Sequence, residues 1–375
     1  MADVRVAVVG VAGMGQAHLF AVPAVDGATL AGVFDINAEA AAKAATDHRT
    51  IAFATYETLC TSGDVDAVVI ATPPAAHVPL VRSALEAGLH VYCEKPFAPT
   101  AAECLALDAV ASERGVVAHV GLQFRYHAAY AATRHIVAGG DIGEVFRANV
   151  VATNWFRAQR YFEVSPWRAA WRTAGGGVLL SQAIHQLDAM LTLTGMPSRV
   201  SAQWYRANHV AEVEDEVVAL LEWSNGARGT LTASLNDPGG HELIEVHGDR
   251  GAVQCAGYDV RRATYDSAQR TTRECADEFP DTTIEWESVN VERKRSEWFD
   301  MLIDCHREFV AAITEGRPSA LDAAEGTRVI EFVNALYESA ASGEPVTLPI
   351  ATTDYTKTFE QLSDGSLGVP GAPRR

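Results

Sequence analysis

Short apolar runs that alternate with helix-forming segments constrain the fold of the first third of this chain more than any other feature. The apolar runs are Val4–Gly10, Thr29–Asp35, Ala67–Thr72, His90–Cys93 and Val116–Val120. The segments between them are rich in Ala, Leu and Glu: Gln16–Val22, Ala38–Ala45, Ala75–Ala87 and Ala101–Glu113. Buried strands that alternate with helices form right-handed β–α–β units and a mostly parallel sheet. We therefore expect an α/β, doubly wound domain over residues 1–126.

The pattern changes from about Ala148 onward. Strand-like segments separated by turn signals follow, at Val200–Arg206, Val217–Trp223, Arg228–Leu235 and Leu243–Gly248. They predict a largely antiparallel sheet. Two strongly helical segments, Ser296–Thr314 and Asp322–Ser339, come next. We expect an α+β domain over residues 127–350 and a C-terminal tail over 351–375, whose last part, Ser363–Arg375, is loose because it holds Gly, Pro and Ser.

Composition excludes several classes of function. The net charge of −18 repels phosphate backbones and anionic lipids, so we expect no nucleic-acid partner and no membrane partner. No apolar run approaches the length of a membrane helix, and the first residues lack the flanks of a signal peptide. The six cysteines form no C-x-x-C pair, which argues against a metal site or a disulfide framework and indicates a cytoplasmic protein.

A glycine-rich turn follows the first strand and opens a helix: Gly10-Val11-Ala12-Gly13-Met14-Gly15. In such turns the glycines allow a tight bend and a close approach to pyrophosphate, which then lies at the helix N-terminus. Asp35 ends the second strand, and a carboxylate there accepts the ribose hydroxyls of adenosine and repels a 2′-phosphate. Neither Ile36 nor Asn37 offers a positive charge for that phosphate, which favours NAD over NADP. Alternatively, the turn is only a packed turn and Asp35 caps the next helix.

Ligands of open α/β sheets bind at the carboxyl ends of the strands, where two further groups of residues lie. Thr72-Pro73, with His77 one turn later, can present a hydroxyl and backbone groups to a dinucleotide, or can simply start the next helix. Glu94-Lys95-Pro96 follows the next strand. Lys95 is suited to reach the reacting end of a cofactor because the pKa of a lysine shifts readily, and Glu94 could orient it. The alternative for Lys95 is an exposed salt bridge.

These residues together resemble the glucose–fructose oxidoreductase / inositol dehydrogenase / MocA (Gfo/Idh/MocA) family. The resemblance rests on Gly10-x-Ala12-Gly13-x-Gly15-x-x-His18, Ala71-Thr72-Pro73, Glu94-Lys95-Pro96, Gln123-x-Arg125-Tyr126, Trp167-Arg168, Gly175-Gly176-Gly177 and Ser181-x-x-x-His185-x-x-Asp188. It covers nearly the whole chain. It implies a nicotinamide-dependent oxidoreductase of sugars or cyclitols, with a Rossmann domain and a second domain built on an open, mostly antiparallel sheet.

The resemblance also implies roles for single residues. Lys95 and His185 would line the reacting carbinol as catalytic residues. The family often has Asp where this chain has Ser181, so an Asp–His relay cannot be assumed; Gln182 or a water could orient His185, and Asp188 could hold the imidazole or contact only backbone. The cofactor-binding residues expected are Gly10, Ala12, Gly13, Met14, Gly15, Asp35, Ile36, Thr72, Pro73, His77, Glu94, Lys95, Gln123, Trp167 and Arg168. The substrate-binding residues expected are Lys95, Arg125, Tyr126, Arg157, Trp171, Ser181, Gln182 and His185.

The segment from Asn154 to Arg172 is dense in aromatic and guanidinium groups, which is unusual in so acidic a chain. Aromatic faces pack on sugar C–H groups, and guanidinium groups bind hydroxyls or carboxylates. As part of a substrate pocket, the segment suggests an anionic or highly hydroxylated sugar. Trp, Tyr and Arg are also enriched at subunit interfaces, so an interface is the alternative.

The function predicted is hydride transfer between nicotinamide and a secondary alcohol of a sugar, sugar derivative or cyclitol. Two alternatives are a redox-neutral enzyme that recycles tightly bound NAD and a catalytically silent dinucleotide-binding regulator. Retention of Lys95 and His185 weighs against the regulator, and Ser181 is its best support. The open sheet must cover its exposed face, so a homo-oligomer, dimer or tetramer, is expected.

Overall fold

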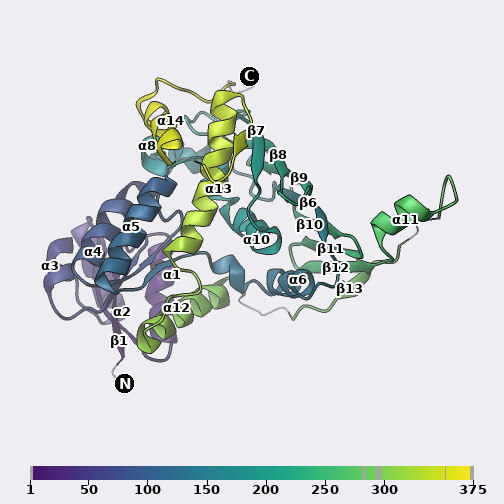
Figure 1. Ribbon diagram of the computed structural model, residues 1–375. Coiled ribbons are helices and arrows are strands. Elements are labelled where there is room, and N and C mark those ends of the chain that lie inside the picture. Colours follow the sequence, from purple (N-terminus) through teal and green to yellow (C-terminus); the bar gives the residue numbers. More distant parts are fainter. Residues whose placement is uncertain (1–2, 282–283, 293–296, 351, 372–375) are drawn as a thin grey trace. The chain divides into compact units, whose positions relative to one another are not determined.

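A computed structural model describes residues 3–281, 284–292, 297–350 and 352–371 of the chain (Figure 1). The chain divides into two compact units. The first comprises Met1–Gln123, Arg172–Gly175 and Ser296–Glu331, and the second comprises Phe124–Trp171, Gly176–Arg295 and Phe332–Arg375. The N-terminal part of the first unit ends at Gln123. Helix α12 (Glu297–Glu315) packs on α1 (Met14–Ala21) and is grouped with the first unit.

The sheet of the first unit is parallel throughout, with the order β2-β1-β3-β4-β5 among the described strands. These strands are β1 (Val4–Val9), β2 (Ala28–Phe34), β3 (Ala67–Ile70), β4 (His90–Cys93) and β5 (Ala118–Val120). The other elements are α1, η1 (Val22–Ala24), α2 (Ala38–His48), α3 (Tyr56–Thr61), η2 (Pro74–Ala76), α4 (His77–Glu86), α5 (Ala101–Arg114) and α12. The doubly wound α/β domain is confirmed.

Burial explains why the strands of this sheet read as continuous apolar runs. All four residues of β3 are buried, because helices cover both faces of the sheet. The helices begin at capping side chains: Asn37 accepts hydrogen bonds from the amides of Glu39 and Ala40 at the start of α2, and Thr100 accepts one at the start of α5.

The second unit is built on a larger sheet, with the order β13-β12-β11-β10-β6-β9-β8-β7-β14 among the described strands. Neighbouring strands pair antiparallel except β6 with β9, so the mostly antiparallel open sheet is confirmed. The strands are β6 (Val145–Ala152), β7 (Arg199–Tyr205), β8 (Glu216–Glu222), β9 (Arg228–Ser234), β10 (Glu242–Gly248), β11 (Gly251–Ala256), β12 (Asp259–Thr264), β13 (Glu287–Val289) and β14 (Val346–Thr347). The helical elements along this part of the chain are η3 (Gln123–Tyr126), α6 (Ala128–Ala138), α7 (Arg160–Glu163), η4 (Pro166–Ala169), α8 (Trp171–Ala174), α9 (Val178–Ser181), α10 (Ile184–Thr194), α11 (Ala268–Glu274), α13 (Ala323–Ser342) and α14 (Thr352–Asp364).

One face of this sheet forms the core of the second unit. Residues of β7 alternate strictly between exposed and buried, and α6, α9 and α10 pack against the sheet. The buried face carries apolar side chains such as Trp204 and Leu231. The opposite face exposes Tyr205, Val218 and Leu220.

The tail expected over 351–375 contains α14. Within Ser363–Arg375, the part expected to be loose, Val369 is only 3% exposed. The guanidinium of Arg206 donates to the carbonyls of Val369 and Gly371, at 3.1 and 3.0 Å. The described part of this segment is therefore attached at the end of β7, because Arg206 supplies donors that a reading of the Gly- and Pro-rich sequence does not reveal. Residues 372–375 of the expected tail lie outside the described residues.

Candidate functional site

The glycine turn lies between β1 and α1 and leaves open space for a ligand. Gly13 has φ +54°, in the left-handed region, and a Cβ added there would meet no atom within 4 Å. A Cβ added at Gly15 would instead collide with the carbonyl oxygen of Gly10, so that position requires glycine for packing. Ala12 is exposed and its carbonyl accepts from the amide of Gly15 at 2.9 Å. The methyl group of Ala12 is therefore compatible with the turn.

Asp35 is joined to this turn by a hydrogen bond. Its Oδ2 accepts from the amide of Val11 at 2.9 Å, and its Oδ1 accepts from the amide of Asn37 at the same distance. Asn37, not Asp35, caps α2. The structure thus rejects the alternative in which Asp35 is the helix cap. Ile36 is almost fully exposed beside it.

Two buried polar atoms lie beyond the carboxyl ends of β3 and β5 without a partner among the described residues. They are Thr72 Oγ1 and Gln123 Oε1. The ring of His77 holds the backbone at Thr72 in place. Its Nε2 lies 2.9 Å from the Thr72 carbonyl oxygen, and its Nδ1 lies 2.7 Å from the Pro96 carbonyl oxygen. Burial lowers the pKa of His77, and the two carbonyls oppose that shift.

Glu94 of the Glu-Lys-Pro motif is buried in the first unit. Its Oε1 lies 3.1 Å from His18 Nε2, and His18 Nδ1 lies 2.8 Å from His306 Nε2. The amide of Lys95 donates to Glu94 Oε2 at 3.3 Å. Glu94 therefore holds the backbone of the motif, and Lys95 itself is half-buried at the end of β4 rather than fully exposed.

These residues fit a dinucleotide. The open turn and the helix N-terminus suit a pyrophosphate, and the Asp35 carboxylate suits ribose hydroxyls. Thr72 Oγ1 and Gln123 Oε1 are unused hydrogen-bonding groups for further polar atoms of such a ligand.

His185 lies on α10 in the second unit, and the residue is 6% exposed. It stacks on Phe124, with ring centroids 4.3 Å apart and an interplanar angle of 14°. Ser181 is the last residue of the preceding short helix α9. Gln182 accepts from Arg157 through Oε1 and donates to the Tyr161 hydroxyl through Nε2, so its role as an orienting group for His185 stays a prediction.

Glu214 holds the segment before His185, and sequence reasoning missed it. The buried carboxylate accepts from the amides of Gly177 at 2.7 Å and Leu179 at 3.1 Å, and from the Tyr337 hydroxyl at 2.7 Å. Burial raises the pKa of Glu214 to about 7, against these hydrogen bonds. The only signal in the sequence is the run of three acids, Glu214-Asp215-Glu216, before an apolar stretch.

Asp188 pairs with Arg125, both in the second unit. The guanidinium Nε lies 2.7 Å from Oδ2, and Nη2 also donates to Oδ1, so the pair is bidentate and nearly buried. Asp188 therefore does more than contact backbone. Arg125, expected to bind substrate, is held by this acid.

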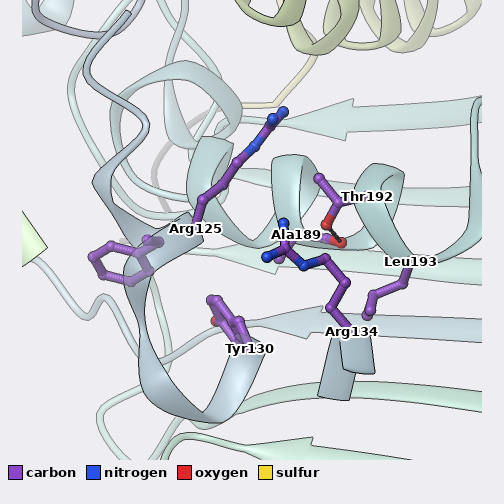
Figure 2. A pocket seen from close by; sticks show the side chains of 7 residues that line it. Arg125, Tyr130, Arg134, Ala189, Thr192 and Leu193 are labelled. Carbon is purple, nitrogen blue, oxygen red and sulfur yellow. Dashed lines mark hydrogen bonds between the residues drawn. The ribbon is translucent and has the colours of Figure 1, made fainter. Parts of the chain in front are cut away.

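Arg125 also lines a pocket at α6 and α10 (Figure 2). The other residues of its lining are Phe124, Tyr130, Arg134, Ala189, Thr192 and Leu193. Neither His185 nor Ser181 is among them, so we do not place the reaction in this pocket. Tyr126, beside Arg125 in η3, is half-buried.

The aromatic and guanidinium segment is divided between surface and core. Arg157 lies over the rings of Trp155 and Tyr161, at 5.5 and 5.4 Å from their centroids. Arg168 lies 4.2 Å from the Tyr161 centroid and 5.2 Å from that of Trp167. Trp171, in contrast, is 1% exposed, and its indole N–H donates to the Glu212 carbonyl at 3.1 Å.

Trp171 is therefore a core residue, which corrects its place among the expected substrate-binding residues. It packs against Trp204 and Tyr337 on the buried face of the sheet. Aromatic residues suit a core as well as a sugar site, so composition alone could not separate the two.

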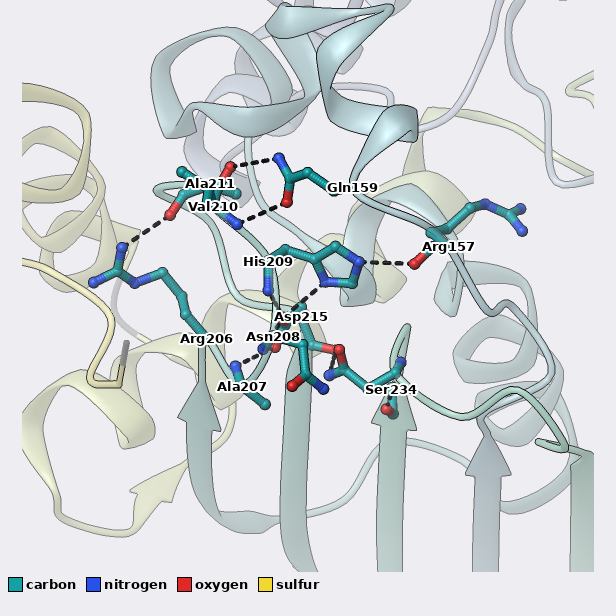
Figure 3. Close-up of polar contacts among 11 residues, drawn as sticks. Arg157, Gln159, Arg206, Ala207, Asn208, His209, Val210, Ala211, Asp215 and Ser234 are labelled. Carbon is teal, nitrogen blue, oxygen red and sulfur yellow. Dashed lines mark hydrogen bonds and ion pairs between the residues drawn. The ribbon is translucent and has the colours of Figure 1, made fainter. Parts of the chain in front are cut away.

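His209 and Asp215 form a second buried arrangement that sequence reasoning missed (Figure 3). Asp215 accepts from the amides of Ala207, Asn208 and His209, and lies 2.8 Å from His209 Nδ1. These hydrogen bonds lower the pKa of Asp215 to about 2, although burial opposes them, and the carboxylate raises the pKa of His209. His209 Nε2 in turn lies 2.8 Å from the backbone carbonyl of Arg157.

Two domain models of one protein family match most of the chain. Residues 4–122 match the model described as the NAD-binding Rossmann fold of an oxidoreductase family, and residues 134–348 match the C-terminal alpha/beta domain of the same family. The chain belongs to the Gfo/Idh/MocA oxidoreductase family. It is thus an oxidoreductase with an NAD-binding Rossmann domain, which confirms the resemblance seen in the sequence.

Individual Gfo/Idh/MocA relatives match along nearly their whole length. Inositol 2-dehydrogenase 3 of Saccharopolyspora erythraea is 29% identical over 358 residues, which cover 94% of this chain and 96% of the relative. The solved structure of levoglucosan dehydrogenase in complex with NADH and levoglucosan has a TM-score of 0.79 and 24% identity, covering 93% of this chain and 100% of that one. GenD2 from gentamicin A biosynthesis, in complex with NAD, has a TM-score of 0.77 and 26% identity, covering 93% and 97%.

Among the described residues no helix is long and apolar enough to span a bilayer.

Proposed function

We propose that this protein is an NAD-dependent dehydrogenase that interconverts a secondary alcohol and a ketone on a sugar, sugar derivative or cyclitol. The observation that carries the proposal is the presence of Lys95 and His185 at both family motif positions, in a chain that matches the family along both units. The relatives named inositol 2-dehydrogenase and levoglucosan dehydrogenase support the substrate class. The six cysteines, without a disulfide, support a cytoplasmic location.

The residues proposed to hold the cofactor are those of the glycine turn, Asp35, Thr72 and Gln123. NAD, when bound, supplies the hydride acceptor. Asp35 favours NAD over NADP, because its carboxylate would meet a 2′-phosphate with like charge. Pro73, Glu94 and His77 support this edge of the sheet, and Trp167 and Arg168 remain candidates for the nicotinamide end.

In the proposed mechanism, Lys95 and His185 both act on the hydroxyl of the reacting carbinol. A neutral imidazole, with an ordinary pKa near pH 6.5, can take the hydroxyl proton. An ammonium can donate a hydrogen bond to the same oxygen and stabilise the negative charge that develops on it. Phe124 restrains the ring of His185 by stacking, and Ser181 offers only a hydroxyl where the family often has a carboxylate.

The test is the turnover of K95A and H185A, measured as absorbance at 340 nm with a panel of sugars and cyclitols. We expect each variant to lose about 100-fold or more in kcat and to bind NAD within about threefold of wild type. Lys43→Ala and His135→Ala, which remove an exposed lysine and an exposed histidine, are the controls. Near wild-type turnover by K95A or H185A removes that residue from the mechanism.

The same assay separates the two alternative functions. Product without net NADH would indicate a redox-neutral enzyme, and NAD binding without turnover of any substrate would indicate a regulator. Ser181 in place of a carboxylate is the observation that favours the regulator.

A further inference from the structure

We infer that Arg157 anchors a carboxylate group of the substrate, so that the preferred substrate is an acidic sugar or cyclitol derivative. The inference rests on the proposed function and names its substrate class more narrowly. The guanidinium of Arg157 donates to two neutral acceptors, the Phe156 carbonyl at 3.0 Å and Gln182 Oε1 at 2.7 Å. Within the described chain no acid pairs with it, although the protein carries a net charge of −18.

The surroundings of Arg157 are aromatic and positively charged. Trp155 and Tyr161 present their ring faces to its guanidinium, and Arg168 lies over the same Tyr161 ring. Arg168 likewise forms no ion pair with an acid in the described residues; its Nη1 donates to the Tyr161 carbonyl. Two guanidinium groups at one ring repel each other, and an anion between or beside them removes that cost.

Trp155 supplies a further hydrogen-bond donor beside Arg157. Trp155 Nε1 is buried and has no hydrogen-bond partner among the described residues. A buried N–H without an acceptor is costly, and a ligand oxygen would satisfy it. The guanidinium and the indole N–H are both donors that carboxylate oxygens can satisfy, since a carboxylate accepts several hydrogen bonds and donates none.

The cluster formed by Trp155, Arg157, Tyr161 and Arg168 lies near His185, the proposed catalytic histidine, within the same unit. The ring centroids of Trp155 and Phe124 are 6.5 Å apart, and Phe124 stacks directly on His185. Gln182, which accepts from Arg157, precedes His185 by three residues. A substrate held by Arg157 therefore lies on the same aromatic surface as the imidazole.

The backbone of Arg157 is held in place on both sides. Its amide donates to the Leu235 carbonyl at 3.0 Å, and its carbonyl lies 2.8 Å from Nε2 of His209. Asp215 holds His209 in turn (Figure 3). An anchor that is fixed before the ligand arrives loses little conformational entropy on binding, which favours selective recognition.

The test compares acidic and neutral probes on wild type, Arg157→Gln and Arg160→Gln. Calorimetric titration in the presence of NADH measures binding of D-glucuronate, D-gluconate, D-glucose, myo-inositol and glucose 6-phosphate. We expect wild type to bind at least one carboxylate probe about 10- to 100-fold more tightly than the neutral probes, and R157Q to lose that preference. Arg160, exposed and paired with Glu163, is the control for the loss of one positive charge, and R160Q should keep the preference.

The outcomes are distinct. Equal binding of acidic and neutral probes by wild type, preference for the phosphate probe, or an unchanged preference in R157Q overturns the inference. A change of oligomeric mass in R157Q with carboxylate selectivity intact also overturns it and assigns the segment to a subunit interface. Turnover is followed at 340 nm in parallel, so selective carboxylate binding without turnover counts against the proposed function and not against this inference.

Discussion

Asp35 shows how one side chain can serve both the fold and the cofactor. Its two oxygens accept from the amides of Val11 and Asn37, which joins the end of β2 to the glycine turn. A carboxylate oxygen accepts more than one hydrogen bond, so these two bonds leave capacity for ribose hydroxyls. Asp35 therefore contributes two hydrogen-bond acceptors to the fold and, in addition, a negative charge toward the ribose.

Substitution of Asp35 separates these two contributions. We expect wild type to use NAD at least about 10-fold more efficiently than NADP, and Asp35→Asn to reduce that ratio by about 10-fold, because the amide loses the charge and keeps one of the two acceptor oxygens. Asp35→Ala should in addition weaken binding of both cofactors. Initial rates with each cofactor measure the ratio, and a ratio unaltered in D35N would show that charge at this position does not discriminate.

A substitution at Gly15 tests the packing of the same turn. Gly15→Ala places a methyl group against the carbonyl oxygen of Gly10, so we expect the free energy of unfolding to fall by about 3 kcal/mol and NAD binding to be lost. Denaturant titration and calorimetry measure the two effects. Gly239→Ala is the control, since a Cβ there meets no atom within 4 Å. Equal effects of the two substitutions would contradict the packing argument.

At the scale of secondary structure, α9 depends on a carboxylate that comes from a different part of the chain. α9 has only four residues, too few to be stable alone. Glu214, just before β8, accepts from the amides of Gly177 and Leu179 and so satisfies donors at the start of this helix. Ser181 and the turn into α10 follow directly, so Glu214 is a positioning residue for the segment that leads to His185.

The raised pKa of Glu214 makes stability depend on pH. Its folded-state pKa of about 7 lies above the ordinary value of 4.5, so the folded protein binds the proton more tightly than the unfolded chain. The contribution is fully present below about pH 4.5 and is lost as the pH rises through about 7. The free energy of unfolding should fall by about 3 kcal/mol across this window because of Glu214.

Denaturant titrations from pH 4.5 to 8 on wild type and Glu214→Gln measure the contribution of Glu214 to the free energy of unfolding, as the difference between the two pH profiles. The amide does not ionise, so E214Q should show the shallower profile. Glu86→Gln, at an exposed glutamate, should follow wild type. Parallel profiles for wild type and E214Q would contradict the assignment.

At the scale of the whole molecule, the sheet of the second unit has one covered and one exposed face. Val218 and Leu220 of β8 are 44% and 61% exposed, and Gln203 and Ser201 of β7 lie opposite them. Tyr205 extends the same face. An exposed apolar face of an antiparallel sheet is typical of a surface that pairs with a second copy, and we propose a homo-oligomer through this face.

Leu220→Lys tests that proposal. A charge at the centre of an apolar interface is costly to bury, so we expect the variant to have a lower molar mass than wild type by light scattering after gel filtration. Val210→Lys, at an exposed loop position, is the control and should keep the mass of wild type. An identical mass for wild type and L220K would place the interface elsewhere.

Much of the fold could be predicted because the signals are local. Valine-rich runs mark β1 and β3, and the glycine turn and Asp35 mark the cofactor edge within a short stretch of sequence. The predicted helices at Ala101–Glu113 and Asp322–Ser339 correspond closely to α5 and α13. The prediction that Ser363–Arg375 is loose was wrong for its described part, because the Arg206 contacts join residues far apart in the sequence.

Local patterns in the sequence predicted the class of fold, and motifs carried the resemblance to the family and the candidate residues, because both depend on neighbours along the chain. The surroundings of each candidate depend on the folded structure. It paired Arg125 with Asp188, put Trp171 in the core, placed Arg157 over two aromatic rings, and buried Glu214 against α9. Burial and charge pairing arise between residues far apart in sequence, and these two properties set pKa values and hydrogen-bonding partners.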